Sequence, residues 1–156
     1  MLEVGALAPS FCLDGISPSG ESLRVCSQEL KGKAFVLYFY PKDDTPGCTT
    51  EACDFRDNLN TLGIDVYGVS PDSIESHKKF IQKHSLNFVL LSDPDFEVAK
   101  AFGAYGKKKL YGKESEGIIR STFVIDKEGK IALALYNVKA KGHVENLSKK
   151  VSQLSL

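Results

Sequence analysis

One uninterrupted apolar run constrains the fold of this chain more than any other feature. It extends from Ala34 to Tyr40 and reads Ala-Phe-Val-Leu-Tyr-Phe-Tyr, with no charged residue interrupting it. A strand with one solvated face alternates polar and apolar residues, whereas a strand covered on both faces does not. We therefore predict a central strand that ends at Pro41 and carries helices on both faces, as in a three-layer α/β domain.

Other segments supply the remaining elements of such a domain. Further strands are predicted at 64–70, 88–91, 121–125 and 130–135. Apolar residues at offsets of three and four predict helices through four stripes: Ala52 to Leu62, Ile74 to Ile81, Phe96 to Phe102 and Val144 to Leu154. The last two strands are joined by a tight turn ending in Gly129, and a tight hairpin cannot join parallel strands, so the sheet should be mixed. We expect one domain over residues 1–156, with an irregular N-terminal part containing short strands such as 23–26.

Charge and hydropathy exclude several partners. The chain has 20 basic and 20 acidic residues, which gives no electrostatic case for nucleic acid or an anionic membrane. No segment approaches the length of a membrane span, and the N-terminus lacks the basic region of a signal peptide. We therefore expect a cytoplasmic protein whose partner is a small molecule or another protein.

The segment from Pro41 to Cys53 carries the chemistry. It leaves the central strand and enters a helix, which is where α/β sheets usually build their sites. Pro46 and Gly47 place Cys48 near the first helical turn, where free backbone N–H groups and the helix dipole favour a thiolate. Thr45 can direct its hydroxyl at the same sulfur or at a bound oxygen substrate.

Two acidic residues oppose this interpretation. Asp43 and Asp44 would disfavour a nearby thiolate, so they must face away or be outweighed by a cation from elsewhere.

The second cysteine, Cys53, lies five residues after Cys48. In an intact α-helix this spacing separates the Cα atoms by about 8–9 Å, from the helical rise and radius. A disulfide tolerates roughly 7 Å at most, so the helix must unwind before the two sulfurs can bond. The spacing suits a bond that is made and broken in a cycle.

Alternative interpretations of the four cysteines are less favoured. Cys48 and Cys53 could be inert core residues, and we interpret Cys12 and Cys26 as plain buried thiols. A zinc site is not expected, because Cys-x4-Cys has no second ligand pair and the histidines lie at no useful spacing. The Cys-x-x-Cys motif of thioredoxin-type redox sites is absent from the sequence.

The stretch from Phe39 to Cys53, with its Pro-x-x-x-Thr-x-x-Cys core, resembles the peroxiredoxins. The second cysteine five residues on is similar to the bacterioferritin-comigratory-protein, or peroxiredoxin Q, branch. The similarity extends over the chain, from the segment Gly5 to Phe11 to the segment Arg120 to Asp126.

That resemblance implies a thioredoxin-like fold and a thiol peroxidase acting on hydrogen peroxide and organic hydroperoxides. It implies roles for Pro41, Thr45, Cys48 and Arg120, with Cys48 as the peroxidatic cysteine and Cys53 as the resolving one. Arg120 would supply the cation that outweighs the negative charges of Asp43 and Asp44. The sulfenic acid of Cys48 would give a Cys48–Cys53 disulfide, which thioredoxin or a similar dithiol reduces. No cofactor or metal is implied, and the expected state is a monomer.

Two other functions remain open. A general disulfide oxidoreductase on the same fold would react with peroxide no faster than free cysteine. A redox-switched binding protein would use Cys48–Cys53 oxidation to expose apolar residues such as Phe55 and Leu59. Elsewhere, we interpret the lysines of Gly106 to Lys113 as solvated loop residues near the site mouth, and the three histidines as surface or boundary residues.

Overall fold

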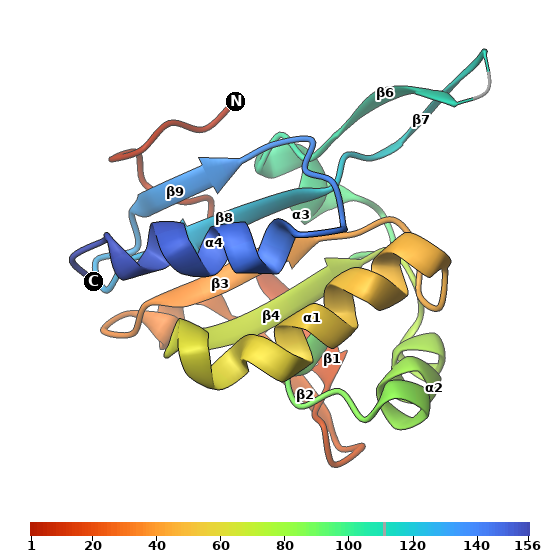
Figure 1. The fold of residues 1–156 in the computed structure, drawn as a ribbon, viewed down its shortest axis with the longest axis horizontal. Coiled ribbons are helices and arrows are strands. Elements are labelled where there is room, and N and C mark those ends of the chain that lie inside the picture. Colours follow the sequence, from red (N-terminus) through yellow and green to blue (C-terminus); the bar gives the residue numbers. More distant parts are fainter. Residues whose placement is uncertain (111) are drawn as a thin grey trace.

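The computed structural model describes residues 1–110 and 112–156, and Figure 1 shows a twisted sheet covered by helices. The sheet has seven strands in the order β2-β1-β5-β4-β3-β8-β9, and β6 and β7 form a separate hairpin. The strands are β1 (Cys12–Ile16), β2 (Ser22–Cys26), β3 (Phe35–Phe39), β4 (Asp65–Ser70), β5 (Val89–Ser92), β6 (Tyr105–Leu110), β7 (Lys113–Ile118), β8 (Ser121–Ile125) and β9 (Ile131–Leu135). The helices are α1 (Pro46–Leu62), α2 (Ile74–His84), α3 (Glu97–Ala101) and α4 (His143–Ser152), with a 3-10 turn, η1 (Ser27–Leu30).

The sheet is mixed, as predicted. Strands β3, β4 and β5 are parallel neighbours, because helices connect them along the chain. Strand β8 pairs antiparallel with β3 on one side and with β9 on the other. The turn between β8 and β9 contains Gly129 at a φ of 81°, the left-handed conformation expected for that glycine.

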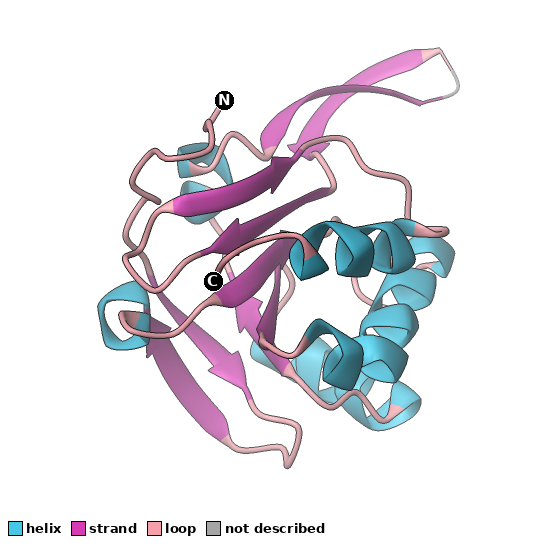
Figure 2. Ribbon diagram, turned by 60° about the vertical axis from the view of Figure 1, so that its left-hand side comes forward, coloured by secondary structure: helices cyan, strands magenta, loops and turns pink. Residues whose placement is uncertain are grey.

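Strand β3 is buried along its whole length and separates two cores. Val36 and Tyr38 of this strand, together with Tyr40 just after it, pack with α1, α2 and α4. Its odd-numbered residues, from Phe35 to Phe39, pack with α3 and the N-terminal segment. Figure 2 shows the three longer helices grouped on one side of the sheet. The apolar run therefore has the two covered faces that its composition predicts.

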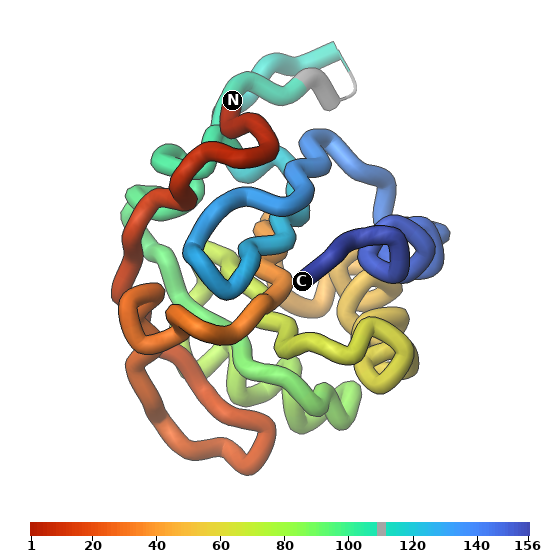
Figure 3. Tube along the Cα trace, turned by 90° about the vertical axis from the view of Figure 1, so that its left-hand side faces the viewer, coloured from red at the N-terminus to blue at the C-terminus, as the bar shows by residue number. Residues whose placement is uncertain are grey.

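The N-terminal part is more regular than expected. Strands β1 and β2 form an antiparallel hairpin at one edge of the sheet. The first residues run beside the start of β9, where the Gly5 amide donates to the Ile131 carbonyl oxygen at 2.8 Å (Figure 3). The prediction of a strand at 23–26 is confirmed, and β1 is an additional strand that it missed.

The lysine-rich segment is a strand and not a loop. Lys107 and Lys108 lie in β6, which pairs with β7 in a hairpin that projects from the body of the molecule (Figure 1). Tyr111, which the same interpretation covered, lies outside the described residues. The prediction failed because the lysines give this segment no apolar pattern typical of a strand. The strand is instead stabilised by pairing with β7.

Cys12 and Cys26 are not buried free thiols, and that interpretation is wrong. The two residues face each other across β1 and β2 and are joined by a disulfide. Cys12 is exposed and Cys26 half-buried. Sequence spacing alone could not reveal the pairing, because it depends on the register of a hairpin that the pattern did not predict.

Among the described residues, no helix has both the length and the apolar character needed to span a membrane.

Candidate active site

The structure places Cys48 in the first turn of α1, immediately after the loop that leaves β3. Thr45 is the N-cap residue and Pro46 occupies the first helical position, where its fixed φ suits a helix start. The Cys48 side chain is buried, with a relative exposure of 2%. The sulfur therefore belongs to the positively polarised end of the helix and is reached by little water.

Arg120, the residue just before β8, lies next to this sulfur. Its Nη2 donates to Cys48 Sγ at 3.4 Å, and its Nη1 donates to Glu51 Oε1 at 2.6 Å. A Cβ on Gly47 would lie 3.2 Å from Arg120 Nη2, so a side chain at that position would crowd the guanidinium. The arginine comes close because residue 47 is glycine, and its guanidinium is in direct contact with the Cys48 sulfur.

Glu51 is a member of this site that the sequence analysis did not identify. It is fully buried one helical turn after Cys48, and burial raises its pKa to about 7 although Arg120 acts in the opposite direction. Burial alone would lower the pKa of Arg120, but the charges of Glu51 and Cys48 raise it. A sequence signal existed: an acidic residue three positions after Cys48 lies on the same buried helix face as Ala52 and Phe55.

Pro41 and Thr45 lie on the segment that connects β3 to α1, ahead of Cys48. The Thr45 hydroxyl donates to the Lys42 carbonyl oxygen at 2.9 Å, which leaves its lone pairs as acceptors. Pro41 is half-buried and, with Arg120 and Lys108, lines a groove of about 910 Å³. Burial and the charge of Arg120 lower the pKa of Lys108, which places this lysine close to the reactive centre.

Cys53 lies half-buried further along the same continuous helix. Both Cys48 and Cys53 are free thiols in this structure. The structure is therefore that of the reduced form of this pair, with the helix intact between the two cysteines.

The two aspartates of the loop face away from the sulfur. Asp43 is buried, and its carboxylate accepts hydrogen bonds from Tyr40 Oη at 2.5 Å, Ser76 Oγ at 2.8 Å and His77 Nδ1 at 2.6 Å. Asp44 instead pairs with Lys83 and His84 on the surface of α2. Both acidic residues thus bind α2, which removes the conflict noted from the sequence.

His77 is completely buried and His143 is also buried, so the interpretation of all three histidines as surface or boundary residues is wrong for these two. Its Nδ1 lies against Asp43 and its Nε2 lies 2.9 Å from the Leu91 carbonyl oxygen. His77 therefore joins the loop before Cys48 to β5 through two buried hydrogen-bond contacts.

We expect His77→Ala to lower the free energy of unfolding by about 1–3 kcal/mol, the usual cost of leaving a buried polar group without its hydrogen-bond partner. Urea denaturation followed by circular dichroism measures this loss. His84→Ala is the matched control, because the His84 ring contacts Asp44 at the surface. A loss no larger than that of the control would mean that the Asp43–His77 pair does not hold the loop.

His143, at the start of α4, is the second buried histidine. Its Nε2 lies 2.7 Å from Thr122 Oγ1 and 4.0 Å from Glu51 Oε2, an atom with no hydrogen-bond partner among the described residues. Burial and then the charge of Arg120 lower the pKa of His143 to about 4. The unpaired carboxylate oxygen of Glu51 and the neutral imidazole of His143 therefore lie next to each other in the buried site.

These two pKa values act on stability in opposite directions. Glu51 titrates near 4.5 when unfolded and about 7 when folded, so the stability it contributes at low pH is lost as pH rises through this range. His143 titrates near 6.5 when unfolded and about 4 when folded, so stability is lost as pH falls through that range. Each difference corresponds to about 3 kcal/mol, and in the wild type the two largely cancel between pH 4.5 and 6.5.

We therefore expect His143→Gln to lose about 3 kcal/mol of stability as pH rises from 4.5 to 7, because only Glu51 then titrates. Glu51→Gln should show the opposite slope between pH 4 and 6.5. Urea denaturation at intervals of pH measures both variants against the wild type. Two slopes of the same sign would contradict the assignment.

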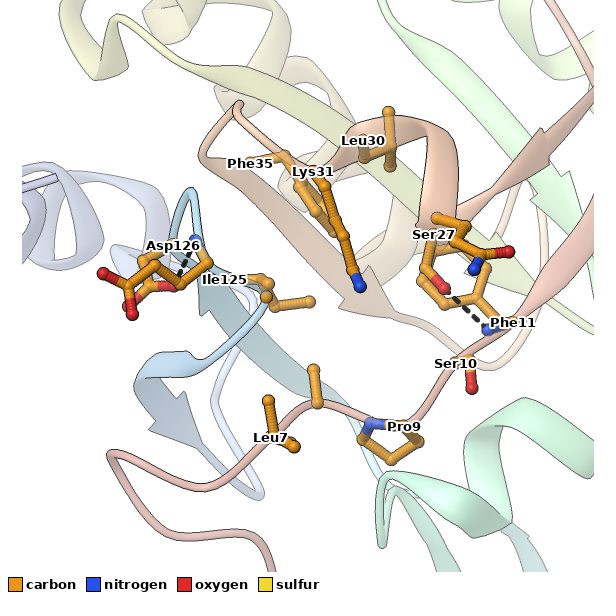
Figure 4. A pocket seen from close by; sticks show the side chains of 14 residues that line it. Leu7, Pro9, Ser10, Phe11, Ser27, Leu30, Lys31, Phe35, Ile125 and Asp126 are labelled. Carbon is orange, nitrogen blue, oxygen red and sulfur yellow. Dashed lines mark hydrogen bonds between the residues drawn. The ribbon is translucent and has the colours of Figure 1, made fainter.

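A second hollow, of about 300 Å³, lies at the other end of the sheet. Figure 4 shows it between the N-terminal segment and η1, with Pro9, Phe11, Phe35 and Ile125 among its lining residues. Phe35 begins β3 and Ile125 ends β8, whereas Cys48 and Arg120 lie near the opposite ends of these strands. The hollow is therefore not part of the cysteine site.

Within the residues that the structure describes, no cluster of histidine, cysteine and acidic side chains has an arrangement suited to a metal ion.

Comparison with known proteins agrees with this geometry. Residues 4–134 match the model of the AhpC/TSA family. Peroxiredoxin Bcp of Bacillus subtilis is 48% identical, over 99% of this chain and 98% of its own. Peroxiredoxin Bcp of Escherichia coli is 41% identical, over 91% of this chain and 90% of its own.

A solved structure shows the same fold. The bacterioferritin comigratory protein of Xanthomonas campestris superposes with a TM-score of 0.82 at 36% identity, covering 97% of this chain and 96% of that one. The predicted thioredoxin-like fold and branch are confirmed. The chain therefore belongs to the AhpC/TSA family, in its bacterioferritin-comigratory-protein or peroxiredoxin Q branch, and is a thiol peroxidase.

Proposed function

We propose that Cys48 is the peroxidatic cysteine and Cys53 the resolving cysteine of this peroxidase. Family membership gives a peroxide as the oxidant and a thiol as the reductant. The observation that carries the assignment is the contact of Arg120 Nη2 with Cys48 Sγ at 3.4 Å, in the first turn of a helix. Cys53 has no comparable cation among its described hydrogen-bond partners.

The first step is attack of the Cys48 thiolate on the terminal oxygen of a hydroperoxide. The O–O bond breaks, Cys48 becomes a sulfenic acid, and the leaving oxygen departs as an alkoxide or hydroxide that takes up a proton. Arg120 and the helix N–H groups stabilise the charge as it moves from sulfur to that oxygen. Thr45 orients the peroxide through its hydroxyl, and Pro41 shields the sulfur from water.

The second step joins the two cysteines. Cys53 attacks the sulfur of the Cys48 sulfenic acid, and water leaves as the disulfide forms. Because α1 is continuous from Pro46 to Leu62, its first turns must unwind before the sulfurs can meet. A dithiol protein then restores both thiols through a mixed disulfide. Thioredoxin is the reductant that we propose.

The substrates that we propose are hydrogen peroxide and organic hydroperoxides. The Xanthomonas campestris relative is described by its alkyl peroxide reduction activity. Apolar residues such as Pro71, Phe96 and Ile119 line the groove beside Arg120, which gives an alkyl group a surface to contact. We further propose that the single domain acts as a cytoplasmic monomer, since resolution within one chain needs no partner subunit.

A peptide map tests the cysteine roles. Trypsin cuts after Lys42 and after Arg56 with no site between them, so the peptide 43–56 contains both Cys48 and Cys53. After one equivalent of hydrogen peroxide, mass spectrometry should find this peptide two hydrogens lighter. A peptide that gains oxygen without an internal bond would exclude Cys53 as the resolving thiol.

Cys53→Ser provides the kinetic counterpart. This variant should consume one equivalent of peroxide and then stop, because the sulfenic acid has no intramolecular partner. Turnover of the wild type with thioredoxin distinguishes the proposal from a redox-switched binding protein, which would show no such turnover. A general disulfide oxidoreductase would instead react with peroxide as slowly as free cysteine. Normal thioredoxin-linked cycling by Cys53→Ser would refute the resolving role.

A further inference from the structure

A second cysteine pair lies away from the peroxidatic site. Cys12 of β1 and Cys26 of β2 are directly opposite in the register of the hairpin, with their Cα atoms 4.0 Å apart and their sulfurs bonded. Strand β2 lies at one edge of the seven-stranded sheet. Neither cysteine lines the groove beside Arg120.

The hydrogen-bond pattern makes this disulfide independent of the strand pairing. The Ser27 amide donates to the Phe11 carbonyl oxygen at 2.8 Å, and the Ser17 amide donates to the Glu21 carbonyl oxygen at 2.9 Å. In an antiparallel ladder these bonded pairs alternate with non-bonded pairs, so Cys12 and Cys26 form a non-bonded pair, in which side chains lie closest. Opening the disulfide therefore breaks no backbone hydrogen bond.

The disulfide lies on the solvated face of the hairpin. Side chains alternate along a strand, so Cys12 shares its face with Asp14, whose carboxylate pairs with Arg24 at 3.3 Å. Both partners of that ion pair are about two-thirds exposed, at 69% and 66%. Leu13, on the other face, is buried in the core. Cys12 itself is exposed, so a thiol in solution can reach this bond.

We propose that Cys12 and Cys26 form a second thiol–disulfide exchange site, separate from Cys48 and Cys53, on which dithiol reductants act. To open it, an external thiolate attacks Cys12 sulfur, and Cys26 leaves as a thiolate that takes up a proton. The second thiol of the reductant then displaces Cys12 and becomes part of the reductant's own disulfide. To close it, one cysteine thiolate attacks the disulfide of an oxidised dithiol, and the other then displaces the dithiol, which leaves with both of its sulfurs reduced.

The two states of this site differ in stability. The closed bond forms a ring across a sequence separation of 14, which restricts the unfolded chain. For a ring of this size the oxidised protein should melt about 5–10 °C higher than the reduced one. The redox state of the edge hairpin therefore sets the resistance of the whole domain to heat, without altering the site at Cys48.

Trypsin separates the two cysteine pairs, which allows a direct test. It cuts after Arg24 and after Lys31, so Cys12 lies in peptide 1–24 and Cys26 in peptide 25–31, whereas the peroxidatic pair is in 43–56. The folded Cys48→Ser/Cys53→Ser variant is equilibrated with mixtures of reduced and oxidised dithiothreitol, and its free thiols are blocked. Peptides 1–24 and 25–31 should appear linked in oxidising mixtures and separate in reducing ones, in a reversible titration. Reduced thioredoxin should separate them as well.

Two results would overturn the proposal. A linkage that resists dithiothreitol and thioredoxin until urea is added would show a permanent structural bond. Peptides that never become linked would show two independent thiols. The Cys12→Ser/Cys26→Ser variant should retain wild-type peroxide turnover and lose the redox dependence of its melting temperature. Turnover of that variant reports on Cys48 and Cys53 alone, so the two proposals can fail separately.

Discussion

Cys48→Ser is expected to abolish peroxide reduction, because a serine hydroxyl is far less acidic and less nucleophilic than a thiol and so does not attack the O–O bond. The fold should survive, since the smaller hydroxyl replaces a sulfur in the first turn of α1. Initial rates of hydrogen peroxide consumption with dithiothreitol as reductant measure the loss. A reagent specific for sulfenic acid should label the wild-type peptide 43–56 and leave the variant unlabelled.

Cys12→Ser is the matched control for this result. It removes a thiol from the same chain but from outside the groove, and it should turn over peroxide at the wild-type rate. If Cys48→Ser also kept turning over at that rate, the peroxidatic thiol would have to be another cysteine.

Arg120→Ala is expected to lower kcat/KM for hydroperoxide by about 10²–10³-fold, the usual cost of removing one donor that stabilises developing charge. The variant loses the 3.4 Å contact with Cys48 Sγ and the ion pair with Glu51. Steady-state kinetics at saturating reductant measure the effect. Arg120→Lys should retain part of the activity, since a point charge cannot bind the sulfur and the carboxylate together.

The loss of Arg120 also leaves Glu51 buried without a partner. The combined variant Arg120→Ala/Glu51→Gln removes that carboxylate, so it should recover stability in urea denaturation and remain as inactive as Arg120→Ala. Recovery of activity in the combined variant would mean that Arg120 only offsets Glu51 and does not act on the peroxide.

The sequence predicts the part of the fold that depends on the apolar pattern. The buried strand β3, the two parallel strands beside it and the β8–β9 hairpin follow from runs of apolar residues with proline or glycine at their ends. It also indicates Cys48 at a helix start and Arg120 at the entry to a strand, since both positions depend on local residue order.

What the sequence does not predict depends on contacts between distant segments. Asp43 and His77 are 34 residues apart, and only the packing of α2 against the loop brings them together. The disulfide of Cys12 and Cys26 depends on the register of a hairpin, and Glu51 becomes part of the site through Arg120, which is 69 residues away. In each case the role of the residue depends on a partner that is distant in the sequence, and the residue type alone does not identify that partner.

The attachment of both aspartates to α2 limits how far motion at Cys48 can spread. In the proposed cycle, unwinding of α1 would free the residues after Thr45, whereas Asp43 is bonded to three side chains and Asp44 to two. The boundary between moving and fixed backbone therefore falls just before Cys48. In the proposed cycle, a chain anchored on that side would bring the Cys48 sulfur toward Cys53 and return it to the same position, which would restore the geometry of the peroxide site.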